Sequence, residues 1–227
     1  MYQHDASVIM PVCAWPDPAN MDGDVHPQLL RALDSVEAAI RPYYGAPSPS
    51  VELLVGVDGY AHRVMEAVRS WAAQHPSVTT VMQAFERSER VTYGNRQRNR
   101  FLDQGPTGRL VLWQDQDDRF FPFALTRVVA VANQFPGDAL MFKMKKYGSG
   151  NEPVVLWETE GRVQRGHVGG HMLVTPNEPE LLGRWEPETE YTADYEFIAQ
   201  TVDKCLTAGR QVVWRDEFIS MLRPWCA

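Results

Sequence analysis

Three carboxylates within four residues follow an apolar segment and carry the strongest chemical signal in the chain. The sequence LVLWQDQDD places Asp115, Asp117 and Asp118 directly after this segment. Like charges so close together repel one another unless a cation lies among them. Carboxylate oxygens suit Mg²⁺ or Mn²⁺, which commonly bridge a protein to substrate phosphates. A solvated acidic turn that leads into a helix is the alternative, and the position of the acids at the end of a predicted strand favours the metal site.

The segments around these acids show two kinds of apolar pattern. Continuous apolar runs are typical of strands buried on both faces, and apolar residues at three- and four-residue steps are typical of helices. We predict strands over 7–12, 51–57, 79–83, 109–114, 139–147, 153–158, 170–175 and 211–214, and helices over 29–40, 64–72, 125–135 and 194–208. Loops are predicted over 13–27 and 42–50. The alternation of strand and helix in the first half predicts an α/β fold with a mostly parallel, Rossmann-like central sheet.

The carboxyl ends of these strands are where chemistry is expected, because ligands of an open parallel sheet bind there. Pro11 and Val12 end the first predicted strand, and Asp58 follows the second. Asp58 could hydrogen-bond a nucleobase or a ribose at this edge. An Asp-Gly turn without a ligand is the alternative.

Length and composition bound the class of protein. With 227 residues, 44% of them apolar, the chain is expected to form one domain with an ordinary core. Its 22 basic and 29 acidic residues give a net charge of −7, which argues against a nucleic-acid binder because such domains are usually basic. No apolar stretch is long enough for an integral membrane span, and no signal peptide is recognisable. Cys13, Cys205 and Cys226 lack metal-ligand spacing, so we expect free thiols and a cytoplasmic location.

The order of the motifs resembles that of family 2 glycosyltransferases of the GT-A fold. SVIMPV at 7–12 resembles the family's opening strand. VELLVGVDG resembles its second strand, with Val57 where the family has the first of two acids. Arg98-Asn99, followed by GRLVLWQDQDD, is similar to the stretch that leads into the family's Asp-x-Asp metal motif.

The second half carries the rest of this resemblance. GHMLV at 170–174 resembles the strand beneath the acceptor site, and GRW at 183–185 resembles the segment before the family's Glu-Asp motif. TADYEF is similar to that motif, with Ala193 in place of the Glu. The likeness spans about residues 7 to 200, and the order and separation of the motifs are more specific than any one of them.

The resemblance implies a single GT-A domain over 1–227, with a donor half over about 1–118 and an acceptor half over about 119–227. Asp58 would contact the base of a nucleotide sugar, most often uracil, and Arg98 would lie near the nucleotide or diphosphate. Pro11, Val12 and Gln116 would belong to the same donor site. A surface position is the alternative for Arg98, because it lies in the arginine-rich run NRQRNR.

The resemblance also assigns the reacting groups. Asp115 and Asp117 match the metal motif and would hold Mn²⁺ or Mg²⁺ against the leaving diphosphate. Asp118 would contact the donor sugar or hold the motif in place. Asp194 matches the catalytic base, which would take the proton of the acceptor hydroxyl and give inversion at the anomeric carbon. A cap or first-turn acid of the predicted helix is the structural alternative for Asp194.

Other residues of the acceptor half carry weaker signals. His167 and His171 could supply a third metal ligand or touch the acceptor, although a structural role is favoured for each. Trp185 is the best candidate for an acceptor platform among tryptophans that are core by default. Lys143, Lys145 and Lys146 fit a solvated strand face better than a contact with an anionic acceptor.

We therefore predict an inverting, metal-dependent transferase that moves a sugar from a nucleotide-diphosphate sugar, expected to be a UDP-sugar, to a carbohydrate or natural-product acceptor. A nucleotidyltransferase is one alternative, and the acidic, proline-bearing segment at 13–24 argues against its Gly-rich basic loop. A non-catalytic nucleotide or sugar binder on the same fold is the other. Val57 and Ala193, where the family has acids, keep the binder open.

Overall fold

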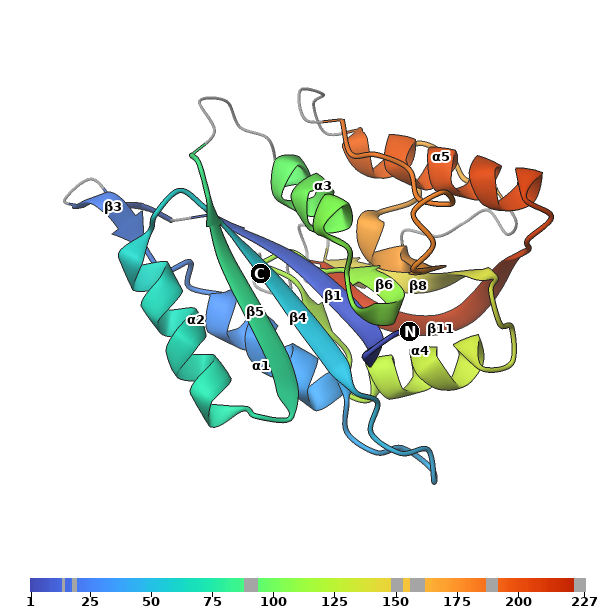
Figure 1. Cartoon of the computed structure of the whole chain (residues 1–227), viewed down its shortest axis with the longest axis horizontal. Coiled ribbons are helices and arrows are strands. Elements are labelled where there is room, and N and C mark those ends of the chain that lie inside the picture. The colour runs from blue at the N-terminus through green and yellow to red at the C-terminus, as the bar shows by residue number, and fades with distance from the viewer. Residues whose placement is uncertain are drawn as a thin grey trace.

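The computed structural model describes residues 1–13, 15–17, 20–87, 94–147, 153–155, 162–186 and 192–222. Nine strands form one sheet in the order β5-β4-β1-β6-β10-β8-β11-β7, with β9 paired to β8 (Figure 1). In chain order these strands are β1 (His4–Cys13), β4 (Val51–Asp58), β5 (Val78–Phe85), β6 (Gly108–Trp113), β7 (Arg119–Phe120), β8 (Ala139–Tyr147), β9 (Pro153–Val155), β10 (Leu173–Pro176) and β11 (Val212–Leu222). A separate hairpin is formed by β2 (Trp15–Asp17) and β3 (Asn20–Asp24).

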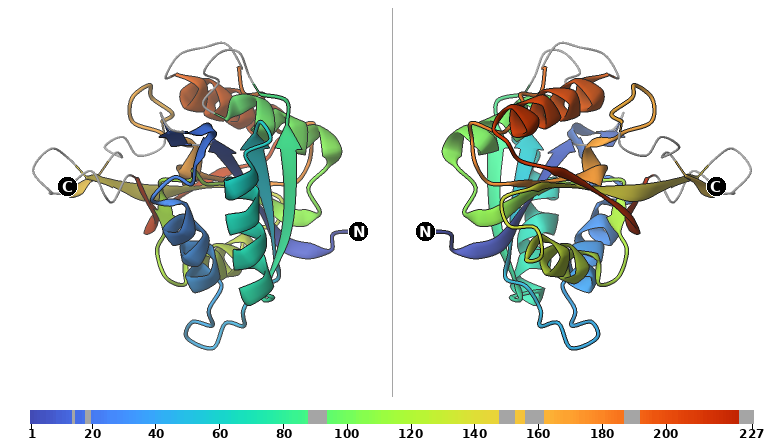
Figure 2. Two further views of the ribbon diagram at one scale, coloured as in Figure 1. Left: turned by 90° about the vertical axis from the view of Figure 1, so that its left-hand side faces the viewer. Right: turned by 90° about the vertical axis from the view of Figure 1, so that its right-hand side faces the viewer.

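Helices cover both faces of this sheet, as the two side views in Figure 2 show. One face carries α1 (Leu29–Ala39), α2 (His62–Gln74) and α4 (Ala124–Ala132), and the other carries α3 (Asn95–Gln104) and α5 (Ala193–Thr207). Each face has its own cluster of buried apolar side chains, because the strands between them are apolar on both sides. None of the helices in the described ranges is both long and apolar enough to cross a bilayer.

The strands of the first half are parallel to one another, which gathers their carboxyl ends at one edge. β1 pairs in parallel with β4 and β6, and β4 pairs in parallel with β5. β10 runs antiparallel between β6 and β8, so that β8 and its parallel neighbour β11 point the same way as the first four strands. The predicted α/β class with a Rossmann-like parallel half is therefore confirmed.

The predicted strand over 170–175 is wrong in its first half. Gly170–Met172 form a 3₁₀ turn, η1, and only the residues after it join the sheet as β10. A Cβ atom on Gly169 would lie 2.5 Å from Met144 Cε, and one on Gly170 would lie 2.9 Å from Trp185 Cη2. The two glycines let the chain turn in a space that a strand with side chains would overfill.

Other departures concern where elements begin and end. β11 continues to Leu222 rather than ending at 214, because it pairs with β8 beyond a bulge between Trp214 and Phe218. The predicted loop over 13–27 contains the β2–β3 hairpin. α3 is not among the four predicted helices, because its first six residues are three amides and three arginines and show no apolar period. Of the strand predicted over 153–158, β9 is described and the remainder lies outside the described residues.

A substitution of Gly108, at the start of β6, tests how closely β6 packs against β1. A Cβ atom there would lie 2.3 Å from the backbone carbon of Ala6 and from the backbone nitrogen of Ser7. Because backbone atoms of a central strand cannot move aside, we expect Gly108→Ala to lower the free energy of unfolding by roughly 2 kcal/mol or more. The measurement is denaturant unfolding of both proteins.

The control is Gly105→Ala. Gly105 has φ of +79° and no atom within 4 Å of its would-be Cβ, so only the left-handed backbone is strained. Its expected cost is about 1 kcal/mol. Equal losses in the two variants would contradict the close approach of the strands.

Candidate functional site

The acidic loop, residues 114–118, leaves β6 at the carboxyl edge and is anchored by the buried side chain of Gln114. Gln114 Nε2 lies 3.1 Å from the carbonyl oxygen of Ala32, 3.1 Å from Ser35 Oγ and 3.2 Å from the carbonyl oxygen of Asp118. Ser35 Oγ also accepts a hydrogen bond from the backbone N–H of Phe120 at 3.1 Å. α1 therefore fixes both ends of the acidic loop from below.

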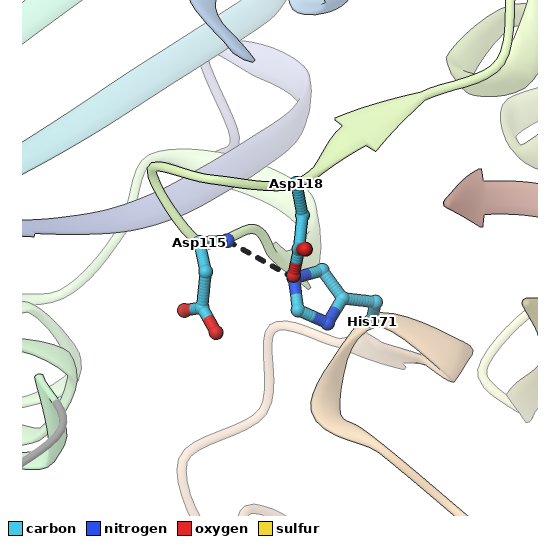
Figure 3. Close-up of side chains that lie close together, drawn as sticks. All are labelled: Asp115, Asp118 and His171. Atoms are coloured by element: carbon cyan, nitrogen blue, oxygen red, sulfur yellow. Dashed lines mark hydrogen bonds and ion pairs between the residues drawn. The ribbon is translucent and has the colours of Figure 1, made fainter. Parts of the chain in front are cut away.

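Two side chains of this loop, Asp115 and Asp118, come together with His171 from the segment that faces it (Figure 3). The ligand atoms of Asp115, Asp118 and His171 lie within 4.8 Å of one another. The side chains of Asp118 and His171 are only 4% and 5% exposed, whereas that of Asp115 is 38% exposed. Two carboxylates and an imidazole are a donor set that Mn²⁺ and related ions accept. The cluster could hold a metal ion, with Asp115 as its accessible member.

One ring nitrogen of His171, Nε2, faces both a hydrogen-bond acceptor and a hydrogen-bond donor. Its Nε2 lies 3.0 Å from Asp118 Oδ2 and 3.0 Å from the backbone N–H of Asp115. Protonated Nε2 donates to the carboxylate, and unprotonated Nε2 accepts from the backbone N–H. Burial by itself lowers the pKa of His171, but the charge and hydrogen bond of Asp118, with the charges of Asp115 and Asp194, raise it to about 9. Without a metal, His171 is therefore a cation at neutral pH.

Arg98 is the second cation of the site, and it is buried rather than on the surface. Its guanidinium donates to the carboxylate of Asp115 and, through Nη1, to Asn95 Oδ1 at 3.1 Å. Its Cζ lies 4.4 Å from the ring centroid of Trp185, whose ring stacks on Phe197 with centroids 4.4 Å apart. Trp185 is 1% exposed. The expectation of an acceptor platform at Trp185 is wrong, because Arg98 and Phe197 already cover the ring.

Asp194 lies in the first turn of α5, as the sequence predicts. Its Oδ2 accepts a hydrogen bond from the backbone N–H of Gly170 at 3.2 Å. Burial raises the pKa of Asp194, Arg98 and His171 oppose the rise, and Asp115 adds to it. The pKa of Asp194 thus lies above its ordinary value of 3.8. A carboxylate with a raised pKa accepts a proton more readily than one in water.

The predicted donor residues of β1 and β4 lie at adjoining strand ends. Pro11 pairs with Gly56, Val12 pairs with Val57, and the residue after Val12 pairs with Asp58 in parallel register. Pro11 and Val12 are buried, and Asp58 is partly exposed. The carboxylate of Asp58 is thus the polar group that this pair of strands places at the edge.

Gln116 ties the acidic loop to the end of β1. Its Oε1 accepts from the backbone N–H of Cys13 at 3.0 Å, and its Nε2 lies 2.9 Å from Cys13 Sγ. Burial raises the pKa of the Cys13 thiol, and the charges of Asp58 and Asp117 raise it further, although the hydrogen bond from Gln116 opposes this. Asp58, Gln116 and Asp117 are thus gathered around one thiol.

Six of the sequence-predicted site residues lie at or just after the ends of β1, β4 and β6, namely Pro11, Val12, Asp58, Asp115, Gln116 and Asp117. Arg98 of α3 contacts Asp115, and Asp194 of α5 contacts the backbone of Gly170. Their roles in binding and catalysis remain predictions. The described cluster that could hold a metal contains Asp115 with Asp118 and His171, and Asp117 is not part of it. The sequence signal for His171 is a histidine directly after Gly169-Gly170 in a predicted strand, for which sequence analysis favours a structural role over a metal ligand. Trp157 and Cys226 lie outside the described residues.

The chain resembles known proteins in its structure, but comparisons of sequence find no match. No known family profile and no curated sequence matches the chain. Staphylococcus aureus TarS matches with a TM-score of 0.69 and 16% identity over 96% of this chain and 36% of TarS. A TarS fragment in complex with UDP-GlcNAc matches at 0.67 and 17%, over 96% and 58% of the two chains. The mannosyltransferase PcManGT from Pyrobaculum calidifontis, in complex with GDP-Man and Mn²⁺, matches at 0.61 and 16%, over 96% and 56%.

These matches confirm the predicted GT-A glycosyltransferase fold. At 16–17% identity they show the fold alone. The chain spans between about a third and three fifths of the length of these neighbours.

The imidazole of His171 gives a pH test of the site. In metal-free protein we expect its NMR signals to titrate near pH 9, whereas an unfolded chain titrates near 6.5. The stability that protonated His171 contributes is complete below about pH 6.5 and is lost as the pH rises through about 9. The measurement is a pH titration of histidine-labelled protein with a chelator present. Asp118→Asn is the control, since it removes the main cause of the raised pKa; a titration unchanged by that substitution would disprove the ion pair.

Proposed function

We propose that this chain is a family 2 glycosyltransferase domain that moves a sugar from a nucleotide-diphosphate donor to a hydroxyl of an acceptor. One observation carries the proposal. On a GT-A fold, the acidic loop and Asp194 both contact the same 3₁₀ turn at the carboxyl edge. Within that turn, His171 contacts the acidic loop and Gly170 donates a hydrogen bond to Asp194. A cation-binding acid cluster beside a carboxylate of raised pKa is what sugar transfer from a diphosphate requires.

The donor site is proposed to be the donor half, about 1–118, of a single domain over 1–227. Asp58 would contact the base, and Pro11, Val12 and Gln116 would shape the pocket around it. UDP is the proposed nucleotide, supported by the UDP-GlcNAc in the TarS complex, whereas PcManGT holds GDP-Man. The acceptor is proposed to be a carbohydrate or a natural product, and the protein is proposed to act in the cytoplasm.

The described residues fit a divalent metal ion, Mn²⁺ or Mg²⁺. Within the described ranges, the ligand atoms of Asp115, Asp118 and His171 lie within 4.8 Å of one another, and two carboxylates with an imidazole are a donor set that such an ion accepts. Asp115 and Asp117 are partly exposed and would hold the ion, as in PcManGT a Mn²⁺ accompanies the donor. When bound, such an ion neutralises the charge that develops on the leaving diphosphate.

Asp194 is proposed as the general base. The acceptor O–H would give its proton to the carboxylate of Asp194, while the acceptor oxygen forms a bond to the anomeric carbon. The bond from that carbon to the diphosphate oxygen breaks, and its electron pair leaves with the nucleotide. One base and one direct displacement invert the configuration at the anomeric carbon. Arg98 contributes by holding Asp115 at the donor side of the site.

A non-catalytic binder on the same fold is the second candidate. Val57 and Ala193 favour it, because the resemblance expects an acid at each of these positions. A nucleotidyltransferase has no such support. The two experiments below separate a catalyst from a binder.

Titration calorimetry tests the donor site. We expect UDP to bind more tightly with Mn²⁺ than without, and we expect Asp115→Asn and Asp117→Asn to weaken the Mn²⁺-dependent binding at least about tenfold. Asp203→Asn is the control, since Asp203 is an exposed acid on α5, away from the acidic loop. If the affinity for UDP is the same with and without Mn²⁺ and is unchanged by both loop substitutions, the metal has no part in the proposed donor site.

Hydrolysis and transfer assays with UDP-GlcNAc, UDP-glucose and GDP-mannose test the base. We expect Asp194→Asn to keep UDP binding and to lose turnover by about 100-fold or more, because a general base contributes roughly that factor. Glu196→Gln is the matched control, since Glu196 is the other acid in the first turn of α5. Retained turnover in Asp194→Asn would remove it from this role. UDP binding with no turnover by the wild type would favour the non-catalytic binder.

A further inference from the structure

Two consecutive residues of the η1 turn contact two different parts of the site. Gly170 donates its backbone N–H to Asp194 Oδ2 at 3.2 Å. His171 Nε2 lies 3.0 Å from Asp118 Oδ2 and 3.0 Å from the backbone N–H of Asp115. The proposed base and the acidic loop are therefore joined through two consecutive residues of η1.

The turn has little freedom to move relative to its surroundings. The would-be Cβ of Gly169 is 2.5 Å from Met144 Cε, and that of Gly170 is 2.9 Å from Trp185 Cη2. Trp185 in turn stacks on Phe197, which lies on α5 one helical turn after Asp194. Packing of this kind transmits a shift rather than absorbing it. A displacement of the acidic loop at His171 would therefore reach the N–H that holds Asp194.

The surroundings of His171 suit a residue that positions its neighbours better than they suit a metal ligand. A ligating histidine almost always donates its second ring N–H to a partner. His171 Nδ1 is buried and has no hydrogen-bond partner among the described residues. Its protonated Nε2 already donates to Asp118 Oδ2 at 3.0 Å. The exposed carboxylate of Asp115 is the better ligand of the cluster.

We infer that His171 is a positioning residue that couples the acidic loop to Asp194 through the η1 turn. The hydrogen bond from Gly170 occupies Oδ2 of Asp194, which leaves Oδ1 to take the proton of the acceptor hydroxyl. His171 anchors the residue that follows Gly170, so the base is aligned by this bond only when the acidic loop is in place. The inference rests on the proposed function for the role of Asp194, but the coupling itself can be measured without turnover.

Kinetics with a His171 pair of variants tests the role in catalysis. We expect His171→Leu to lower kcat at least tenfold, since small misplacements of a catalytic group cost up to about 100-fold. The KM for the nucleotide sugar and the Mn²⁺ affinity with UDP should change less than threefold. His171→Gln should recover part of kcat, because its amide can donate to Asp118. A loss of Mn²⁺ affinity that parallels the loss of kcat would overturn the inference and make His171 a ligand, and an unchanged kcat would also overturn it.

A double-mutant cycle tests the coupling without any activity. The denaturation midpoints of Asp118→Asn, Asp194→Ala and the double variant are compared in the wild type and in a His171→Leu background. We expect non-additive shifts in the wild type and additive shifts in the His171→Leu background, whereas direct charge repulsion would persist in both. Should His171→Leu not fold, His171→Asn serves, since its shorter side chain withdraws from Asp118.

The outcomes separate the inference from the proposed function. Additive shifts in the wild type, or non-additivity that survives the loss of His171, would overturn the coupling even in an active enzyme. Non-additivity that disappears with His171 supports the coupling even where none of the three nucleotide sugars is turned over. In that second case the proposed function fails and the coupling stands.

Discussion

The candidate site depends on one buried charge, the guanidinium of Arg98. An arginine that is withdrawn from water must be paired, because an isolated buried charge costs several kcal/mol. The carboxylate of Asp115 supplies the charge, Asn95 supplies a further acceptor, and the ring of Trp185 covers the guanidinium plane. Removing any one of these partners would leave the buried guanidinium of Arg98 less well compensated for its loss of water. The acidic loop, α3 and the segment before α5 are thus held to a common point.

The same helix also fixes the backbone on the acceptor side. Asn99 donates to the carbonyl oxygen of Trp185 at 2.6 Å and accepts from the N–H of Trp185 at 3.0 Å. Asn95 Nδ2 donates to the carbonyl oxygen of Glu186 at 2.9 Å. One helix that packs on β1 and β4 therefore holds the segment that leads towards Asp194. A polar, arginine-rich helix can hold this segment because its side chains form hydrogen bonds to backbone groups and an ion pair with Asp115, rather than filling an apolar core.

Sequence patterns predict those elements of the fold that follow a simple apolar period. The buried strands and the amphipathic α1, α2, α4 and α5 carry continuous or three-and-four-residue apolar patterns, and the acids fall where strands end. The failures share one physical cause, which is that long-range contacts override local pattern. α3 is polar yet buried, the Gly169-Gly170 pair turns where an apolar strand is expected, and β11 runs on because β8 offers it a partner. The pairing of His171 with Asp118 joins residues far apart in the chain, so no local spacing reveals it.

The two positions where the chain departs from the family pattern have a common structural explanation. Val57 is fully buried in the core cluster beneath α1 and α2, and Ala193 is 7% exposed in the cluster beneath α3 and α5. A carboxylate at either position would have to be buried among apolar side chains, which carries a desolvation cost. The next residue in each case, Asp58 or Asp194, instead faces the carboxyl edge and is partly exposed. Compared with the pattern that the chain resembles, the inward acid of each pair is missing and the outward one is present, which is the acid that the proposed function assigns to the nucleotide or to the acceptor hydroxyl.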